Sequence, residues 1–206
     1  MEKRGEIVVK IFIYAVWTII LILGIIDLFS APYRSVIWFV LLVGSVVFYS
    51  ILTRVPKYLY LILMLSIIFG IFGEVLFGFS YKYIYYDKIL HLIDPLIFSL
   101  VIYHLAKSKI KSKLLLVIFC ASAALSLEVI FEIYEYGMDN IFGTQLQGVY
   151  LNAQRFGILT IGKTEVLDKF NDTMLDLIYD FISVLIFMFG FYFYEKMRIL
   201  KFNKKK

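Results

Sequence analysis

Six long apolar segments limit what this chain can fold into more than any other feature of its sequence. Each is about 17–24 residues long, and an α-helix needs about 20 apolar residues to cross the ~30 Å hydrocarbon core of a bilayer. Hydrophobic residues make up 62% of the 206-residue chain, above the roughly 45–50% of soluble domains. The segments lie at residues 8–29, 35–52, 58–79, 89–105, 114–137 and 174–194. We therefore predict an all-α, polytopic membrane helix bundle with six transmembrane helices, forming a single transmembrane domain over residues 1–206.

Lysine and arginine predict the orientation of these helices, because the cytoplasmic loops of membrane proteins are enriched in both residues. With six spans, fifteen of the 21 basic residues fall on the side of the two termini, and six fall on the other side. We therefore expect a multi-pass protein of the cell membrane with both termini in the cytoplasm and one long outer loop at residues 138–171.

Six basic residues follow from Lys196 onward and predict contact with anionic lipid. Because the basic residues flank the spans, the net charge of +5 does not indicate nucleic acid. The oligomeric state stays open.

The acidic residues show the opposite bias, since thirteen of the sixteen lie in the predicted outer loops or in the outer halves of helices. Glu128, Glu132 and Glu135 occur at i, i+4 and i+7 near the end of the fifth segment. At about 100° per residue these positions fall within roughly 60° of one another, so the three carboxylates share one stripe of the helix. A carboxylate inside a span costs at least ~2–3 kcal/mol unless it faces a partner or a wet cavity. The stripe therefore predicts a polar interior.

The helices on either side of this stripe carry matching polar positions. The fourth segment opens with Asp87, His91 and Asp94, and the sixth opens with Asp172, Asp176 and Asp180. At a rise of about 1.5 Å per residue, the three helices place their polar residues in three layers. From the outside inward, the layers are Asp87, Glu135 and Asp172, then His91, Glu132 and Asp176, and finally Asp94, Glu128 and Asp180. Pro95 removes a helical hydrogen bond and frees a backbone carbonyl near His91. We predict an acidic, His-containing pocket that opens to the outer face, with the first layer as its polar rim.

Several of these residues also have purely structural interpretations. Residues that begin helices are equally consistent with caps, namely Asp87, Asn171 and Asp172. Acids near the outer helix ends are consistent with positions in headgroup water, namely Asp27, Glu74, Glu135 and Asp139. Ser99 and Ser126 are typical of helix packing, and Cys120 is typical of an inert core residue.

Many carboxylates close together repel one another, so either several are protonated or a cation neutralises them. One imidazole among many carboxylates suits a hard divalent cation such as Mg²⁺, Mn²⁺ or Ca²⁺. Cys120 is the only cysteine, which excludes a Cys-based zinc site. The expected ligands of such a cation are Asp94, Glu128, Asp176 and Asp180. His91 or Glu132 would then serve as the catalytic general base, because a bound cation lowers the pKa of its water.

Four short motifs occur in an order that is typical of a known family. They are Tyr86-Asp87-Lys88-x-x-His91, Glu132-x-x-Glu135, Phe142-Gly143-Thr144-Gln145 and Asp172-Thr173-x-x-Asp176. The chain thereby resembles the YjdF-type inner-membrane proteins and, more distantly, the VanZ-like membrane proteins, which also carry an Asp-Lys-x-x-His element and a late acidic helix. The resemblance covers about residues 81–184. Two features depart from the YjdF pattern: residues 146–171 separate the third motif from the fourth, and Asp94-Pro95 replaces a small residue.

The resemblance supports the location of a site and implies no reaction, because the YjdF-type family has no established activity. VanZ-like proteins are associated with tolerance of cell-wall-directed glycopeptides. The hypothesis that we favour is a metal-assisted enzyme acting on a lipid-linked or phosphorylated substrate in the outer leaflet. A cation- or proton-coupled transporter would use the same acids as a relay, although the inner half of the bundle lacks acids for a through-path. A structural or envelope-stress-tolerance protein with a stabilising cation is the third hypothesis. The sequence alone does not decide whether the chain is an enzyme.

Overall fold

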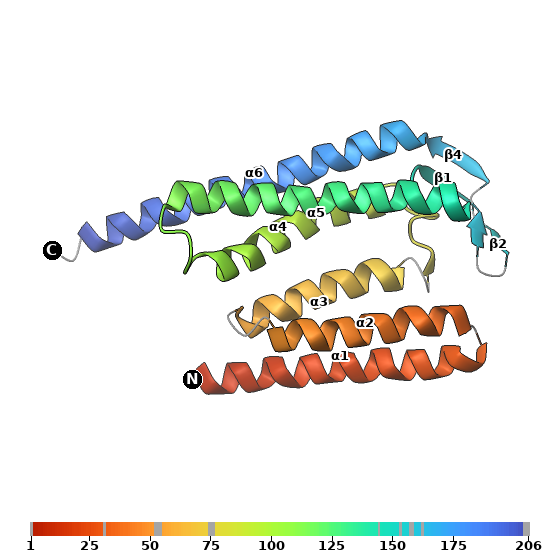
Figure 1. The fold of residues 1–206 in the computed structure, drawn as a ribbon, viewed down its shortest axis with the longest axis horizontal. Coiled ribbons are helices and arrows are strands. Elements are labelled where there is room, and N and C mark those ends of the chain that lie inside the picture. Colours follow the sequence, from red (N-terminus) through yellow and green to blue (C-terminus); the bar gives the residue numbers. More distant parts are fainter. Residues whose placement is uncertain are drawn as a thin grey trace. The chain divides into compact units, whose positions relative to one another are not determined.

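The computed structural model describes residues 2–30, 32–51, 55–73, 77–143, 145–152, 154–156, 159–161 and 163–203. Four features of the sequence analysis lie outside these ranges: the end of the second predicted span at Leu52, the acid Glu74, the motif residue Thr144, and the last three lysines. The chain forms two compact units, Met1–Phe77 and Gly78–Lys206, and each is described separately (Figure 1). The single transmembrane domain over residues 1–206 stays a prediction.

The first unit consists of α1 (Glu2–Ser30), α2 (Pro32–Ile51) and α3 (Lys57–Phe72). Helix α1 packs against both α2 and α3. The approach of α1 to α2 is close at Gly24, where an added Cβ would lie 3.0 Å from the ring of Phe39. Helix α3 is tied to α2 because the Tyr60 hydroxyl donates to the backbone carbonyl of Ser45 over 2.5 Å. Apolar composition, close approach and this polar contact together hold the three helices as one unit.

Asp27 has a structural role inside this first unit. Its side chain is buried, accepts a hydrogen bond from the Trp38 indole N–H over 2.8 Å, and accepts a second from the Ser30 hydroxyl over 3.1 Å. Trp38 is itself fully buried in α2. The carboxylate therefore links α1 to α2 within the fold, and the interpretation that it lies in headgroup water is wrong.

The second unit is built on α4 (Tyr86–Ala106), α5 (Lys113–Phe142) and α6 (Lys169–Asn203). Its helix ends show local signals: the Ser112 hydroxyl accepts from Leu115 N–H before α5, and Gly143 ends α5 with a left-handed φ of 65°. Asp168 caps α6 by accepting from the backbone N–H of Asn171 over 3.0 Å. Hydrogen bonds from the backbone and the side chain of Asn171 lower the pKa of Asp168. These caps satisfy backbone groups that the helix itself leaves without partners.

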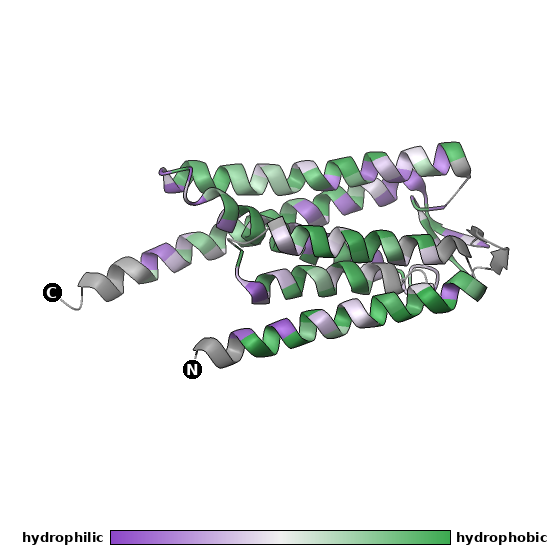
Figure 2. Cartoon of the chain, turned by 60° about the horizontal axis from the view of Figure 1, so that its bottom comes forward, coloured by the Kyte–Doolittle hydropathy of each residue, from purple (hydrophilic) through white to green (hydrophobic). Residues whose placement is uncertain are grey.

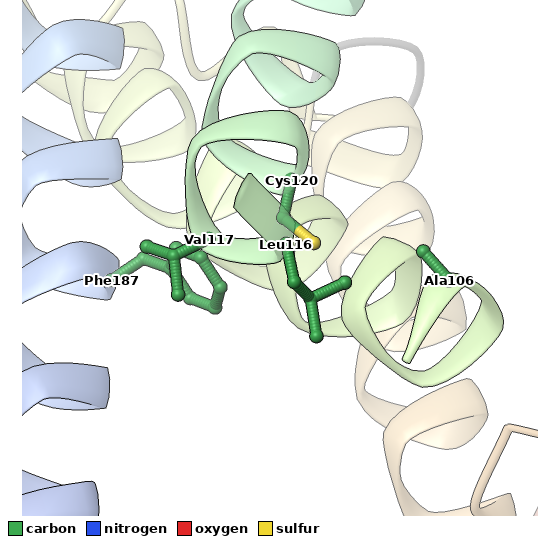
Figure 3. Close-up of a cluster of buried hydrophobic side chains, with 5 residues drawn as sticks. All are labelled: Ala106, Leu116, Val117, Cys120 and Phe187. Atoms are coloured by element: carbon green, nitrogen blue, oxygen red, sulfur yellow. The ribbon is translucent and has the colours of Figure 1, made fainter. Parts of the chain in front are cut away.

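Helices α4, α5 and α6 pack against one another along their lengths (Figure 1). Two apolar clusters fill the part of this bundle on the side of the α4–α5 turn. The first cluster, which we call the apolar plug, consists of Ala106, Leu116, Val117, Cys120 and Phe187 (Figure 3). The second consists of Ala121, Ala124 and Val184. Cys120 is fully buried in the plug, in agreement with its expected place in the core.

The connection between α5 and α6 is not one irregular loop of residues 138–171. Helix α5 continues to Phe142, and α6 begins at Lys169. Four strands lie between them: β1 (Val149–Leu151), β2 (Gln154–Phe156), β3 (Leu159–Ile161) and β4 (Thr164–Leu167). Strand β1 pairs antiparallel with β4, and β2 pairs antiparallel with β3. The sequence analysis contains none of these strands, because each has only three or four residues and too few alternations to form a period.

Helix α3 is shorter than the predicted span at residues 58–79. Gly78 has a φ of 58°, which is a left-handed conformation that does not continue an α-helix. Residues Gly78 and Phe79 are therefore not helical. The apolar segment extends past the end of the helix, because hydropathy reports the environment of a segment and not its backbone conformation.

Four helices within the described residues are long and apolar enough to cross a membrane: Glu6–Ser30, Tyr86–Ala106, Lys113–Ile141 and Lys169–Met197. Two shorter apolar helices, Trp38–Ser50 and Lys57–Gly70, lie where the second and third spans are expected. Most residues of the helices are hydrophobic (Figure 2). Many of the large apolar side chains are exposed. This distribution is typical of helices that face lipid. The mostly helical membrane fold is confirmed, while the count of six spans and their orientation stay predictions.

Two glycine-to-alanine substitutions, one in the connection between α5 and α6 and one inside α5, test the backbone conformations described above. Gly148 has a φ of 88°, and an added Cβ would lie 2.8 Å from the Tyr150 ring and 3.2 Å from the Leu167 carbonyl. We expect Gly148→Ala to lower the free energy of unfolding by at least ~1–2 kcal/mol, as measured by thermal unfolding in detergent. Gly137 lies inside α5 with no atom within 4 Å of an added Cβ, so Gly137→Ala should be neutral or stabilising by about 0.5–1 kcal/mol. Equal effects of the two substitutions would contradict this description.

Cysteine labelling tests the predicted orientation. In a Cys120→Ser background, Ser112→Cys at the start of α5 and Glu165→Cys in β4 each place one exposed thiol at opposite ends of the bundle. Because basic residues concentrate on the side of Ser112, an impermeant maleimide added to intact cells should modify position 165 and leave position 112 unmodified until the cells are opened. External labelling at position 112 would reverse the orientation.

Candidate functional site

The interior of the α4–α5–α6 bundle is polar at the end that carries the strands. The buried polar and charged side chains of this unit are Lys88, His91, Ser99, Glu128, Glu132, Asp139, Gln147, Asp172, Asp176, Asp180 and Ser183. Large apolar side chains on the same helices point outward. Ionisable groups in membrane helices are costly and generally face the bundle interior, where they pair with one another or with water. The sequence stripe on α5 and the polar positions of α4 and α6 therefore meet inside the bundle.

His91 lies at the centre of this interior. Its Nδ1 is 3.0 Å from Asp180 Oδ1, and its Nε2 is 3.7 Å from Asp176 Oδ1. The same Nε2 is 3.6 Å from Asp87 Oδ1 and 3.7 Å from Glu132 Oε1. The imidazole thus contacts carboxylates from α4, α5 and α6. These carboxylates come from all three predicted layers, so His91 joins the layers and does not belong to only one of them.

Lys88 is the basic residue of the site. Its ammonium is 2.5 Å from Asp172 Oδ1, 2.6 Å from Asp176 Oδ1 and 3.1 Å from Asp87 Oδ2. The side chain is buried together with Asp172 and Asp176. Lys88 is not among the site residues predicted from the sequence. A signal was present, because Lys88 precedes His91 by three residues and therefore shares its face of α4.

Several carboxylate oxygens of the site have no hydrogen-bond donor among the described residues. They are Glu128 Oε1, both side-chain oxygens of Glu132, and Asp180 Oδ2. All three residues are buried. Among the described residues, two bases face six acids here: Asp87, Glu128, Glu132, Asp172, Asp176 and Asp180 lie around Lys88 and His91. The carboxylates of the site therefore outnumber its cationic groups.

Within the described part of the chain, two groups of side chains are close enough to hold a cation. One comprises His91, Glu128 and Asp180, all buried, and the other comprises Asp87, His91 and Asp176. In each group the potential ligand atoms lie within 4.8 Å of one another. Asp94 and Glu135 are half-buried neighbours on α4 and α5 and belong to neither group among the described residues.

Asp172 and Asp87 do not act as the caps that their positions also suggested. Asp168 caps α6, whereas Asp172 lies one turn further into the helix and is buried. Asp172 Oδ2 accepts a hydrogen bond from Gly148 N–H over 2.7 Å, while its Oδ1 binds Lys88. At the start of α4, the N-cap residue is Tyr85, and it makes no side-chain cap hydrogen bond. Asp87 lies in the first turn and contacts Lys88 and His91.

The turn before β1 is fastened to the helices beside the site. Asp139 is buried and accepts hydrogen bonds from Leu146 N–H over 2.8 Å and from Gln147 N–H over 3.3 Å. The Lys169 ammonium lies 2.7 Å from the same carboxylate. Gln147 also donates through its side-chain amide to Thr173 Oγ1 over 3.0 Å. Asp139 thus anchors the connection to α5 and α6, and its interpretation as a residue in headgroup water is wrong.

Removing the Lys88 ammonium should be far more costly than removing a comparable surface charge. Lys88→Met leaves Asp172 and Asp176 buried without their cation, and losing one partner of a buried pair costs about 3–5 kcal/mol. We expect a correspondingly large loss of unfolding free energy in detergent. Lys113→Met is the matched control, because the exposed Lys113 ammonium pairs with Glu195 and such pairs contribute about 0–1 kcal/mol. Similar losses in both variants would show that Lys88 has no special role.

Comparison with known proteins places the chain in a family. No curated protein and no solved structure was found to match the chain. A family model described as "Predicted membrane protein (DUF2238)" matches residues 7–197, which cover most of each unit and include every residue of the site. The distant VanZ-like resemblance stays a prediction. The chain therefore belongs to this family of predicted membrane proteins, the YjdF-type family that the motifs of α4, α5 and α6 resemble.

Proposed function

We propose that the second unit binds a divalent cation through His91, Glu128 and Asp180 and uses it to hydrolyse a lipid-linked or phosphorylated substrate. One observation carries the proposal. Buried carboxylate oxygens of Glu128, Glu132 and Asp180 have no donor among the described residues, and they lie around a single imidazole. Buried charges generally need a partner, a proton or a metal ion. A cation with oxygen ligands supplies what these oxygens lack.

The choice between the two candidate ligand groups rests on Lys88. In the group of Asp87, His91 and Asp176, the Asp176 oxygen that faces His91 also binds the Lys88 ammonium over 2.6 Å. The Lys88 ammonium would repel a cation bound by this group. Two unit positive charges about 4 Å apart repel by about 4 kcal/mol at an effective dielectric constant of 20. No described lysine or arginine pairs with the group of His91, Glu128 and Asp180. His91 is therefore a ligand of the proposed cation. Asp176 pairs with Lys88, and Asp94 belongs to neither group, so both are outside the ligand set.

The ligand chemistry indicates a hard cation. Two carboxylates and one imidazole suit Mn²⁺, Mg²⁺ or Ca²⁺, and Mn²⁺ accepts the nitrogen ligand most readily of the three. The His91 nitrogen and the Asp180 oxygen are 3.0 Å apart, a separation that two ligands of one metal ion commonly have. Three protein ligands leave positions for water and substrate.

Glu132 is the general base in this scheme. Both of its side-chain oxygens lack a hydrogen-bond donor among the described residues, and its Oε1 is 3.7 Å from His91 Nε2. It is therefore available to take a proton from water at the cation. In the reaction, the water oxygen would form a bond to phosphorus as its proton passes to Glu132. The bond from phosphorus to the leaving oxygen would break, and Glu132 would pass that proton on to the leaving oxygen.

The charges of the site restrict how a phosphorylated substrate could bind. Lys88 already contacts three carboxylates, and the remaining ionisable side chains at His91 are acidic. A phosphate would be repelled by this interior unless a bound cation attracted it. Substrate binding should consequently depend on the cation.

A cation- or proton-coupled transporter is the second candidate. The observation that favours it is the set of buried acids on successive turns of α5 and α6, where protons could replace a cation on Glu128, Glu132 and Asp180. The apolar plug argues against a through-path, because five buried apolar residues lie between this site and the α4–α5 turn (Figure 3). A protein in which the cation only stabilises the bundle is the third candidate.

Cation binding should raise the stability of the folded protein. A ligand that binds only the folded state stabilises it by about 2.7 kcal/mol at a hundredfold excess over its Kd. We expect Mn²⁺ to raise the unfolding midpoint of the purified protein and a chelator to lower it. Glu128→Gln and Asp180→Asn should abolish this response. Glu165→Gln, a substitution of an exposed carboxylate on β4, should retain it as the matched control.

The outcomes separate the three candidates. An unchanged midpoint in chelator, with Glu128→Gln as stable as the wild type or more stable, would remove the cation and favour protonated acids. The enzyme is tested with a phosphorylated lipid in mixed micelles, where phosphate release should require the cation and should fall steeply in Glu132→Gln. A cation response without any phosphate release would leave a cation with a structural role only.

A further inference from the structure

Two serine hydroxyls lie deep in the second unit without a hydrogen-bond partner among the described residues. Ser99 on α4 and Ser183 on α6 are each fully buried. A serine inside a helix usually donates to the carbonyl four residues earlier, as Ser126 does to Ser122 over 2.8 Å. Neither Ser99 nor Ser183 makes this bond. Helix packing, the structural interpretation of Ser99, explains its burial but leaves its hydroxyl without a partner.

Both hydroxyls lie next to the carboxylate site on the side away from the strands. Ser183 follows Asp180 by three residues, so it lies about 4.5 Å further along α6 on a similar face. Ser99 follows His91 by eight residues, or about 12 Å along α4. Asp180 Oδ2 and Glu128 Oε1, the unpaired oxygens of the site, are on the neighbouring turns. Four unpaired polar groups thus continue from the site toward the middle of the bundle.

The surroundings of the serines offer no protein partner. The cluster of Ala121, Ala124 and Val184 lies at this depth, with Phe98 and Met188 packed against it. Beyond it lies the apolar plug, which includes Cys120 and Phe187 (Figure 3). A hydroxyl that is left dry in such a place loses its hydration without compensation. Buried water commonly fills this role, making about three hydrogen bonds to polar groups that would otherwise have no partner.

We infer that Ser99 and Ser183 form a second binding position, whose ligand is water, beneath the carboxylate site. The water molecules hydrogen-bond to the two hydroxyls and to the free oxygens of Asp180 and Glu128. The position ends at the apolar plug, so it forms a closed extension of the site and not a path across the bundle. It does not depend on the proposed cation, because the two serine hydroxyls need a partner whether or not a metal ion takes up the carboxylate oxygens.

Alanine substitutions test this inference through the sign of a stability change. If water bridges the hydroxyls, Ser99→Ala and Ser183→Ala remove its partners, and each should lower the unfolding midpoint of the full-length protein by roughly 2–4 °C. If the hydroxyls are dry, the same substitutions remove an uncompensated polar group and should raise the midpoint or leave it unchanged. Ser126→Ala is the matched control, since the exposed Ser126 hydroxyl is satisfied within its own helix. Its midpoint should move by less than about 1 °C.

Radiolytic hydroxyl labelling provides a second measurement that a loss of packing alone would not change. Radicals generated from bound water modify the side chains beside it, so Phe98 and Met188 should be labelled in the wild type and much less in the double variant Ser99→Ala/Ser183→Ala. Lower midpoints together with this loss of labelling support the inference. Midpoints that do not fall, or labelling that is absent from the wild type or unchanged in the double variant, would overturn it. Adding chelator to the same samples separates this result from the cation proposal, because the labelling should survive chelation.

Discussion

The ion-pair cluster around Lys88 is the interaction on which the second unit depends. One ammonium contacts carboxylates from α4 and α6, all in the interior of a bundle whose outer surface is apolar. Without that charge, Asp172 would be a buried anion with no cation, and Asp176 would keep only the His91 imidazole, 3.7 Å away. Asp172 also accepts from Gly148 N–H, so the same carboxylate fixes the start of the strand-bearing connection. The cluster thereby joins two helices and the connection at one point.

Lys88 neutralises only part of the acidic interior, and this shortfall gives the site its chemical character. His91 contacts carboxylates from three helices, while oxygens of Glu128, Glu132 and Asp180 have no donor among the described residues. Burying such groups without a partner costs free energy in the core of a soluble protein, and it costs more in a membrane. A cation, protons and water are the available partners. We propose a cation at the level of His91 and water molecules at the level of Ser99 and Ser183.

The site could be located from sequence because helical spacing is regular. Glutamates at i, i+4 and i+7 must share a face, and acids on neighbouring helices of alternating direction must fall at similar depths. Lys88 lies in the motif beside His91, but spacing alone does not show that its ammonium pairs with Asp172 and Asp176. The role of Asp139 could not be predicted because its partners, Leu146, Gln147 and Lys169, are set by the turn geometry and not by any period. The strands could not be predicted because each has only three or four residues.

The sequence by itself determined that the chain is a mostly helical membrane protein with acids concentrated toward one end, since both follow from the length and period of apolar and charged residues. Only the tertiary structure decided which acid meets which base. Rotation and axial shift of a helix are set by packing at places such as Ala124 and Val184, and a shift of one residue turns a side chain by about 100°. This is why the pairing of His91 with Asp180, and of Lys88 with Asp172, could not be derived from spacing alone.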